Sequence, residues 1–271
     1  MTQSILSRNN VQVFGQGAKT LFFAHGFGCD QNMWRFLTPA FQSDYRIVLF
    51  DYVGSGKSDV RAYDAQRYGD LSGYVQDVLD ICTVLELSDV IFVGHSVSGM
   101  IGLLASLQAP ERFERLILIT PSPCYINDPP DYMGGFERAE LEGLFNLMDK
   151  NDFGWASFLA PVVMQNPERP DLTAELEGSF CAADPAIMRR FAEVTFFSDN
   201  RTDLPCISIP SLIIQCSQDV IAPRSVGEYL HQHLPASALR RIEATGHCPH
   251  MSHPAQTAQI IREYLAESGT R

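Results

Sequence analysis

The feature that most constrains this chain is a Gly-x-Ser step at the end of an apolar run. Val90–Val93 reads as a buried strand, and Gly94 and Ser96 follow directly, ahead of a run of small residues that predicts a helix. A strand, sharp turn and helix in this order hold a serine hydroxyl out of regular structure, where it can act as a nucleophile. The usual pattern is G-x-S-x-G, whereas this chain has Ser98 in the fifth position and glycine only at Gly99. Because serine is small enough to keep the helix near the strand, we interpret the turn as a variant of this pattern.

Composition and charge narrow the class of protein. A chain of 271 residues with 45% hydrophobic content can build one large α/β core with an inserted subdomain. Residues 1–8 lack the apolar segment of a signal peptide, and no apolar run approaches the ~20 residues that span a bilayer. A net charge of −12 without a local basic patch disfavours nucleic-acid binding. Seven cysteines without paired spacing favour reduced thiols, so we expect a cytoplasmic protein that binds neither nucleic acid nor membrane.

Strand-like and helix-like segments alternate along most of the chain. Several strand-like runs are apolar on both faces, which is typical of central strands in a parallel sheet covered by helices. The sequence therefore predicts an α/β fold with a mostly parallel central sheet flanked by helices. The expected strands are Val11–Phe14, Thr20–Ala24, Tyr45–Phe50, Val90–Val93, Arg115–Ile119, Ser211–Cys216 and Leu239–Glu243; the expected crossover helices are Leu71–Leu87, Gly99–Leu107, Ser225–His233 and Pro254–Glu267.

The alternation stops between Pro121 and Pro205, where no strand-like run occurs. This segment reads as four helices separated by prolines, and Asp184-Pro185 has the form of a helix start. We expect an all-helical cap, residues 123–204, inserted into a core made of residues 1–122 and 205–271. Such a cap would lie over the carboxyl ends of the strands.

A serine nucleophile needs a histidine base and an acid that orients it. In this fold the chain order is serine, then Asp or Glu, then histidine, each after a strand. Asp219 and His247 both follow expected strands in that order, so we predict the triad Ser96, Asp219 and His247. Other candidates are weaker, because they fit packed, surface or helix-start positions better: His95, His250 and His253 as the base, and Asp199 and Asp203 as the acid.

Attack on a carbonyl also creates an oxyanion that backbone N–H groups must stabilise. We assign one donor to Val97, at the start of the helix after the nucleophile, and the other to Phe27, after the strand Thr20–Ala24. His231 and His233 fit surface positions near a helix end better than metal ligands, and no metal or other cofactor is expected.

The expected cap is rich in aromatic and acidic residues. It holds 8 of the 17 Phe, which predicts a small hydrophobic substrate and excludes a sugar or phosphate ester. Phe153, Phe180 and Phe191 are expected to hold the cap together. Its 15 acidic and 6 basic residues fit a solvated face, with a docking surface for a basic partner as the alternative. The expected pocket residues are Phe27, His95, Tyr125, Phe136, Trp155, Phe158, Phe196 and Phe197; for the cap aromatics among them (Phe136, Trp155, Phe158, Phe196 and Phe197), packing inside the cap is equally open.

Five segments together resemble a known family: His25–Gln31 (HGFGCDQ), Phe50–Gly56 (FDYVGSG), Gly94–Val97 (GHSV), Pro121–Tyr125 (PSPCY) and Gly246–Pro254 (GHCPHMSHP). They resemble the RsbQ-like α/β-hydrolases, which are bacterial stress-response regulators, and are similar to the plant karrikin and strigolactone receptors. Ser98 matches the plant receptors better. The resemblance covers the whole chain and implies a four-helix lid, the same triad, a deep hydrophobic pocket and slow hydrolysis of small esters or butenolide lactones.

The resemblance also implies signalling through a partner, which for RsbQ-like proteins is a PAS-domain protein phosphatase. The sequence therefore predicts a serine hydrolase for a small hydrophobic ester or lactone, acting in RsbQ-like stress signalling. Two alternatives remain. One is a ligand-responsive receptor with slow or single-turnover hydrolysis, and the other is an ordinary metabolic carboxylesterase or C–C hydrolase.

Overall fold

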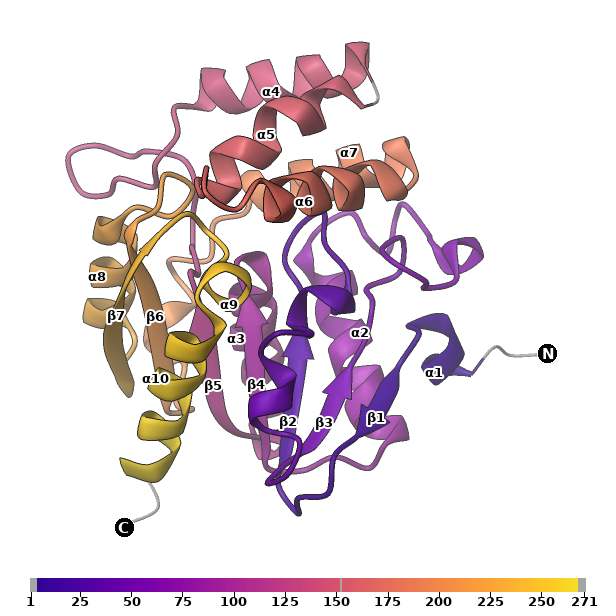
Figure 1. Ribbon diagram of the computed structural model, residues 1–271, viewed down its shortest axis with the longest axis vertical. Helices are drawn as coiled ribbons and strands as arrows, with labels where there is room; N and C mark the ends of the chain where they lie inside the picture. Colours follow the sequence, from indigo (N-terminus) through magenta and orange to yellow (C-terminus); the bar gives the residue numbers. More distant parts are fainter. Residues whose placement is uncertain (1–3, 152, 268–271) are drawn as a thin grey trace.

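The computed structural model describes residues 4–151 and 153–267, which are arranged around a seven-stranded sheet (Figure 1). The strand order is β1-β3-β2-β4-β5-β6-β7, with β1 antiparallel to β3 and every other pair parallel. This confirms the predicted mostly parallel sheet. The strands are β1 Gln12–Phe14, β2 Thr20–Ala24, β3 Arg46–Leu49, β4 Val90–His95, β5 Phe113–Ile119, β6 Ser211–Gln218 and β7 Ser237–Thr245.

Burial along the strands explains their order. β2 and β4 are buried at every position, because helices cover both faces and strands flank both edges. At the edge of the sheet, β7 is mostly half-buried or exposed. In register, Ala24 pairs with Gly94 and His95 with Ile119, so the carboxyl ends of β2, β4 and β5 reach the same edge of the sheet. The loops that leave this edge therefore meet one another.

Helices pack on both faces of the sheet: α2, α3 and α8 on one, and α10 with the short η1 and η2 turns on the other (Figure 1). The α-helices are α1 Ile5–Arg8, α2 Leu71–Val84, α3 Val97–Gln108, α4 Arg138–Lys150, α5 Gly154–Met164, α6 Pro170–Ala182, α7 Pro185–Phe196, α8 Arg224–His233, α9 Pro249–Ser252 and α10 Pro254–Glu267. The 3₁₀ turns are η1 Gln31–Trp34, η2 Thr38–Ala40, η3 Val60–Ala62, η4 Pro110–Arg112 and η5 Leu204–Cys206.

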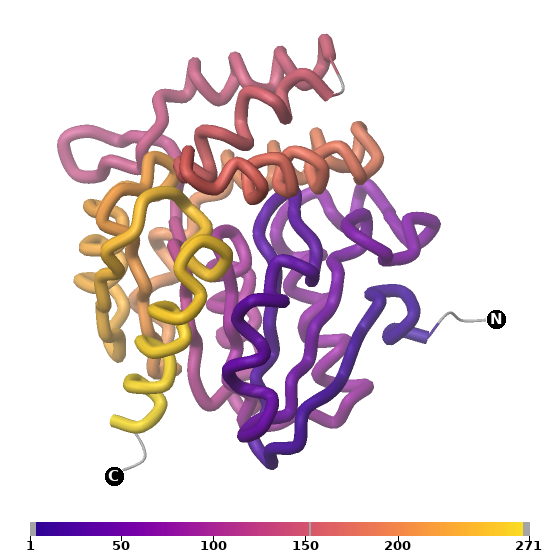
Figure 2. Tube along the Cα trace, in the orientation of Figure 1, coloured from indigo at the N-terminus to yellow at the C-terminus, as the bar shows by residue number. Residues whose placement is uncertain are grey.

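Four helices, α4 to α7, form a cap between β5 and β6 and lie over the carboxyl edge of the sheet (Figure 1). Figure 2 traces α6 and α7 close to the sheet and α4 farthest from it. Helix α7 begins where the sequence predicted a helix start. The Asp184 carboxylate accepts hydrogen bonds from the backbone N–H groups of Ala186 and Ile187, and Pro185 occupies the first helical position.

Two contacts fasten α6 to the core. The Ser179 hydroxyl donates to the carbonyl oxygen of Gly28, and Arg35 forms an ion pair with Glu175. Gly28 has a φ of +70°, and a Cβ there would lie 2.3 Å from the Phe180 ring. The loop after β2 therefore packs directly under α6, with no room for a side chain at this glycine.

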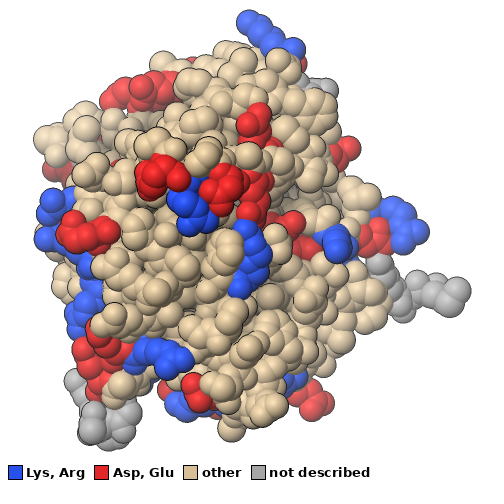
Figure 3. Space-filling model, viewed as in Figure 1, with Lys and Arg blue, Asp and Glu red and all other residues tan. Residues whose placement is uncertain are grey.

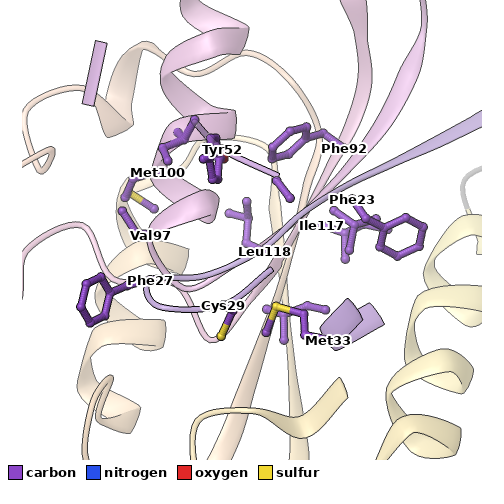
Figure 4. Close-up of a cluster of buried hydrophobic side chains, with 14 of the residues drawn as sticks. Phe23, Phe27, Cys29, Met33, Tyr52, Phe92, Val97, Met100, Ile117 and Leu118 are labelled. Carbon is purple, nitrogen blue, oxygen red and sulfur yellow. The ribbon is translucent and has the colours of Figure 1, made fainter. Parts of the chain in front are cut away.

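Buried apolar side chains run from the sheet up to this loop. Figure 4 shows Leu118 on the side of the strands that faces Val97 and Met100 of α3, whereas Ile117 lies beside Phe23 on the other side. Phe27 lies at the edge of the cluster, where the core meets the cap. Its ring contacts four cap aromatics, with centroid separations of 5.6 to 6.2 Å: Trp155, Phe180, Phe191 and Phe196.

Candidate active site

Ser96 occupies the sharp turn between β4 and α3. Its backbone has a φ of 56° and a ψ of −125°, a strained conformation for a residue with a side chain. The backbone N–H of Ser96 donates to the carbonyl oxygen of Ile119 at 2.9 Å, which ties the turn to β5. At Gly94 a Cβ would lie 2.4 Å from the carbonyl oxygen of Ser98, so this position requires glycine. The turn therefore holds the Ser96 hydroxyl at the edge of the sheet.

His247 and Asp219 continue from Ser96 in a line of hydrogen bonds. His247 Nε2 lies 2.9 Å from Ser96 Oγ, and His247 Nδ1 lies 2.7 Å from Asp219 Oδ2. Because a carboxylate only accepts, Nδ1 carries the proton and Nε2 is free to accept the serine O–H. Asp219 Oδ1 is itself held by the backbone N–H groups of Ile221 and Ala222. The geometry is that of a Ser-His-Asp triad, with the base in the tautomer that can receive the serine proton.

The backbone of His247 is fixed from both the cap and the core. Its N–H donates to the carbonyl oxygen of Val163 in α5 at 2.8 Å, and its carbonyl oxygen accepts from His95 Nε2 and Thr120 Oγ1 at 2.9 Å each. The preceding Gly246 has a φ of +94°, where a Cβ would clash with the backbone of Met164. The position of His247 therefore depends on how α5 packs against the core.

Two backbone N–H groups beside the nucleophile have no hydrogen-bond acceptor within the described part of the chain. Among the described residues, neither the N–H of Phe27 nor that of Val97 donates to a protein group, although both residues are buried. Buried donors of this kind are normally paired, so their freedom marks a place where a ligand oxygen can bind. These are the two N–H groups that we assigned to the oxyanion hole from the sequence.

Comparison with known proteins agrees with this geometry. Residues 21–260 match the alpha/beta hydrolase family. The chain belongs to this family. It is 40% identical to the strigolactone esterase D14 of Arabidopsis thaliana, covering 97% of this chain and 98% of that one, and 37% identical to the karrikin insensitive 2 receptor CA of Petunia hybrida, covering 95% of each. A solved structure of a hydrolase from Oleispira antarctica is 46% identical, with a TM-score of 0.95, and the match covers 97% of this chain and 96% of that chain.

The triad of this α/β-hydrolase opens into a small cavity under the cap. The cavity volume is about 30 Å³, room for one or two water molecules. No Lys, Arg, Asp or Glu stands among its described lining residues, whose side chains are mostly aromatic or aliphatic. They are Phe27, Cys29, His95, Ser96, Tyr125, Leu159, Val163, Leu176, Phe180, Thr195, Phe196, Ile221, His247 and Cys248.

A larger groove of about 530 Å³ lies between the start of α2 and the end of α7, but it contains none of the triad. We assign the chemistry to the smaller cavity, because Ser96 and His247 both line it. A cavity of this volume admits a substrate only when cap side chains or helices move.

Four of the eight expected pocket residues line the cavity: Phe27, His95, Tyr125 and Phe196. The other four are not among its described lining residues, and they lie elsewhere in the cap. Phe158 is 63% exposed, because it faces outward from α5. Trp155 stacks behind Phe180, with ring centroids 5.0 Å apart. Phe136 packs against Phe196, with ring centroids 6.2 Å apart, and Phe197 packs against Phe145, with ring centroids 5.0 Å apart.

The three phenylalanines that were expected to hold the cap together lie in three different environments. Phe180 lines the cavity instead of only supporting the cap, whereas Phe191 packs against core residues and stacks on Tyr74 with centroids 4.4 Å apart. Phe153 is 51% exposed, so the expectation that it holds the cap together is wrong. The aliphatic part of the wall, mainly Leu159, Val163, Leu176 and Ile221, carried no distinguishing signal in the sequence.

Tyr125 places a second hydroxyl at the nucleophile. Its OH lies 3.2 Å from Ser96 Oγ in a buried position, and burial raises the pKa of this phenol, so it stays protonated. Cys29 and Cys248 also line the cavity, and burial raises the pKa of both thiols, which keeps them protonated and unreactive.

His250 lies just outside the cavity, in a histidine cluster. Its ring is 4.5 Å from that of His95 and 4.7 Å from that of Trp34, and neither ring nitrogen has a partner among the described residues. Burial lowers the pKa of His250 to about 3. It belongs to the separate short helix α9, not to the start of the final helix as expected from the sequence.

Proposed function

We propose that this α/β-hydrolase cleaves a small hydrophobic ester or lactone with Ser96 as nucleophile. The observation that carries the proposal is the hydrogen-bonded line from Asp219 through His247 to Ser96, which ends at a small, mostly apolar cavity. A neutral ester or lactone fits apolar walls, whereas a phosphate or sugar acid would meet no cationic partner among the lining residues.

In the acylation step, Ser96 Oγ forms a bond to the carbonyl carbon while its proton passes to His247 Nε2. The carbonyl π electrons move to oxygen, and the N–H groups of Phe27 and Val97 stabilise this oxyanion. When the intermediate collapses, the C–O bond to the leaving group breaks, and His247 gives its proton to the departing oxygen. A water molecule, activated by His247, then releases the acyl group by the reverse sequence. Asp219 holds the imidazole in its tautomer and stabilises the imidazolium.

A receptor is the second candidate function. Its support is that relatives named as receptors, such as the karrikin insensitive 2 receptor CA, match 95% of this chain. In this role the acyl-enzyme would persist, and the cap would change conformation around the bound ligand. The small volume of the cavity favours such coupling, because cap side chains or helices must move to make room for a ligand beside Ser96.

We further propose that signalling is RsbQ-like, in the cytoplasm, with a PAS-domain protein phosphatase as partner. The support is the sequence resemblance, together with the acidic excess of the cap. Acidic clusters lie in the upper half of the face in Figure 3, over the cap and its junction with the core. All seven cysteines are free thiols, and no described helix is both long and apolar enough to cross a bilayer.

An intact-mass time course separates the candidates. The protein is mixed with a p-nitrophenyl acyl ester or a butenolide lactone, beside Ser96→Ala and the matched control Ser106→Ala, a buried serine near the end of α3. Rapid multiple turnover without a lasting adduct favours the hydrolase, whereas one stoichiometric burst with a persistent adduct favours the receptor. Activity in Ser96→Ala equal to that of wild type would disprove the catalytic assignment.

Binding to a purified PAS-domain phosphatase, measured by size-exclusion chromatography with and without the butenolide, tests the partner. We expect co-elution that depends on the ligand and on Ser96. Separate elution in every condition would contradict the proposed partner while leaving the hydrolase intact.

A further inference from the structure

The serine that replaces glycine in the nucleophile motif, Ser98, forms a hydrogen-bonded chain of its own. Its hydroxyl donates to the carbonyl oxygen of His25, in the loop after β2. The hydroxyl of Tyr52 lies 2.9 Å from the same Ser98 oxygen. A carbonyl oxygen can only accept, so the single Ser98 proton goes to His25, and Tyr52 must donate to Ser98. All three side chains are fully buried, and burial raises the pKa of Tyr52, which keeps its proton in place.

The same geometry settles the state of His25. The backbone N–H of Tyr52 donates to His25 Nε2 at 3.1 Å, so Nε2 is an acceptor and the proton sits on Nδ1. His25 Nδ1 then donates to the carbonyl oxygen of Gly26 at 2.9 Å. Burial lowers the pKa of His25, so the ring stays neutral and keeps this tautomer.

These bonds orient the proposed oxyanion donor. The carbonyl of Gly26 and the N–H of Phe27 belong to one planar trans peptide and point in opposite directions. Fixing the carbonyl therefore fixes the N–H. The preceding peptide is held in the same way, because its carbonyl, that of His25, accepts from Ser98. Two successive peptide planes that lead to the Phe27 N–H are thus set by the chain from Tyr52 through Ser98 to His25.

The loop after β2 packs so tightly against the nucleophile turn that small movements matter. A Cβ at Gly26 would lie 2.5 Å from His95 Nδ1 and 3.3 Å from the Cβ of Ser96, so the loop passes against the nucleophile turn at its closest approach. A shift of the loop by a few tenths of an ångström would move the donor relative to the reacting carbonyl. Catalysis depends on donors fixed in advance of the reaction.

We infer that Ser98 is a positioning residue that locks the loop bearing the Phe27 oxyanion donor to the helix bearing the nucleophile, with Tyr52 holding its hydroxyl in place. The inference rests on the proposed function, because it assigns Ser98 a part in stabilising the oxyanion of the Ser96 reaction. It gives a physical reason for serine at a motif position where glycine is usual: only a hydroxyl there can hold the His25 carbonyl.

The test compares Ser98→Ala and Ser98→Gly with wild type and with Ser106→Ala, whose hydroxyl bonds only within α3. The substrate is p-nitrophenyl acetate. The second readout is inhibition by an aryl trifluoromethyl ketone, whose unhydrated carbonyl carbon bonds to Ser96 Oγ while the serine proton passes to His247 Nε2, which gives a tetrahedral oxyanion. We expect kcat to fall about 10- to 100-fold in both Ser98 variants, with KM within about threefold and the inhibition constant rising in parallel with the loss of kcat.

A structural role alone would lower the melting temperature without this split, so thermal unfolding is measured on the same samples. A kcat and an inhibition constant within twofold of wild type in the folded Ser98 variants would overturn the inference. So would a loss of kcat with unchanged inhibition. Should neither Ser98 variant fold, Tyr52→Phe decides: a threefold to tenfold loss of kcat supports the inference, and a value within twofold of wild type contradicts it.

Failure of the proposed function has a different signature. In that case wild type itself forms no Ser96 adduct and shows no turnover that Ser96→Ala abolishes. When wild type is acylated at Ser96 and the Ser98 variants behave as wild type, only the positioning role fails. The double variant Ser98→Ala with Tyr52→Phe is expected to match Ser98→Ala, because both changes break one chain.

Discussion

The core supplies the polar half of the active site from the ends of its strands, whereas the cap covers it with mostly apolar side chains from three helices. Ser96, Asp219 and His247 follow β4, β6 and β7, and each is fixed by short hydrogen bonds to side chain or backbone. The cap half is held mainly by packing, with a few polar contacts from α5 and α6 to the core. Its wall comprises Leu159 and Val163 of α5, Leu176 and Phe180 of α6, and Thr195 and Phe196 of α7.

The two halves therefore have different tolerances. A hydrogen-bonded group at a strand end has one usable geometry, and losing a partner disables it. An aromatic wall can change in volume and still exclude water, so its residues set the size of the substrate more than the chemistry. We expect substitutions in the core half to affect kcat first and those in the cap half to affect stability and substrate choice first.

The largest effect is expected for Asp219→Asn. Asparagine keeps an acceptor oxygen for the N–H groups of Ile221 and Ala222, so the fold should survive, but its amide no longer holds the His247 tautomer. We expect kcat for p-nitrophenyl acetate to fall about 10⁴-fold with little change in melting temperature. Asp199→Asn, which alters a carboxylate paired with Arg201, is the control. Equal losses in the two variants would contradict the assignment of the acid.

The cap half is tested by Phe180→Ala against Phe158→Ala. Phe180 is buried on the cavity wall and stacks on Trp155, so its removal is expected to cost about 3–5 kcal/mol in the free energy of unfolding. The enlarged cavity should raise the preference for p-nitrophenyl hexanoate over acetate. Phe158 is mostly exposed, and its removal should change the free energy of unfolding by less than about 0.5 kcal/mol.

Urea unfolding and the ratio of kcat/KM values for the two esters measure both effects. Phe158→Ala shifting the ester preference as much as Phe180→Ala would mean that the cap is seated differently from the structure.

A smaller, pH-dependent effect is expected at His250. Its pKa is about 3 in the folded protein and about 6.5 in the unfolded chain. Between these two pH values the unfolded state binds a proton at His250 and the folded state does not. Stability is therefore lost as the pH falls below about 6.5, by about 2 kcal/mol between pH 7 and pH 5 from this residue alone. His250→Leu should remove that part of the pH dependence.

Urea unfolding at pH 7 and pH 5 measures the difference, with His231→Gln, at an exposed position of α8, as the control. His25 and His95 also have lowered pKa values, so part of the acid sensitivity should remain in His250→Leu. An unchanged difference between the two pH values would mean that His250 is protonated in the folded protein.

The smallest effect is expected where the two halves meet. Arg35 and Glu175 pair across the junction of η1 and α6, but each side chain is about one-third exposed. Exposed pairs contribute about 0–1 kcal/mol and are screened by salt. Arg35→Gln should therefore lower the free energy of unfolding by less than about 1 kcal/mol, and less again in 1 M NaCl. A loss above about 2 kcal/mol would show that this pair, and not aromatic packing, holds the cap closed.

The same contrast explains how far the sequence could be interpreted. The parallel sheet was predictable, because runs such as Leu212–Ile214 are apolar on both faces, and the candidate triad followed from the order of strand ends. The cap wall was not, because α5 is apolar nearly all round: Phe158 and Leu159 are neighbours, yet one is exposed and the other lines the cavity. Which face of such a helix turns inward depends on packing with its neighbours.

The role of Ser98 could be predicted only in part from the sequence. Its departure from the usual motif was visible in the sequence, but its partners, the carbonyl of His25 and the hydroxyl of Tyr52, come from other segments that only the fold brings together.

The most direct test of the central claim is to locate the nucleophile chemically. The protein is treated with an alkyl fluorophosphonate, which loses fluoride when a serine oxygen bonds to phosphorus, and the adduct is mapped by tandem mass spectrometry of the digested protein. We predict one adduct per chain, on Ser96, formed at least about 10³-fold more slowly in Asp219→Asn and absent from Ser96→Ala. An adduct on another residue, or ester hydrolysis by wild type that continues after Ser96 is fully modified, would contradict the account.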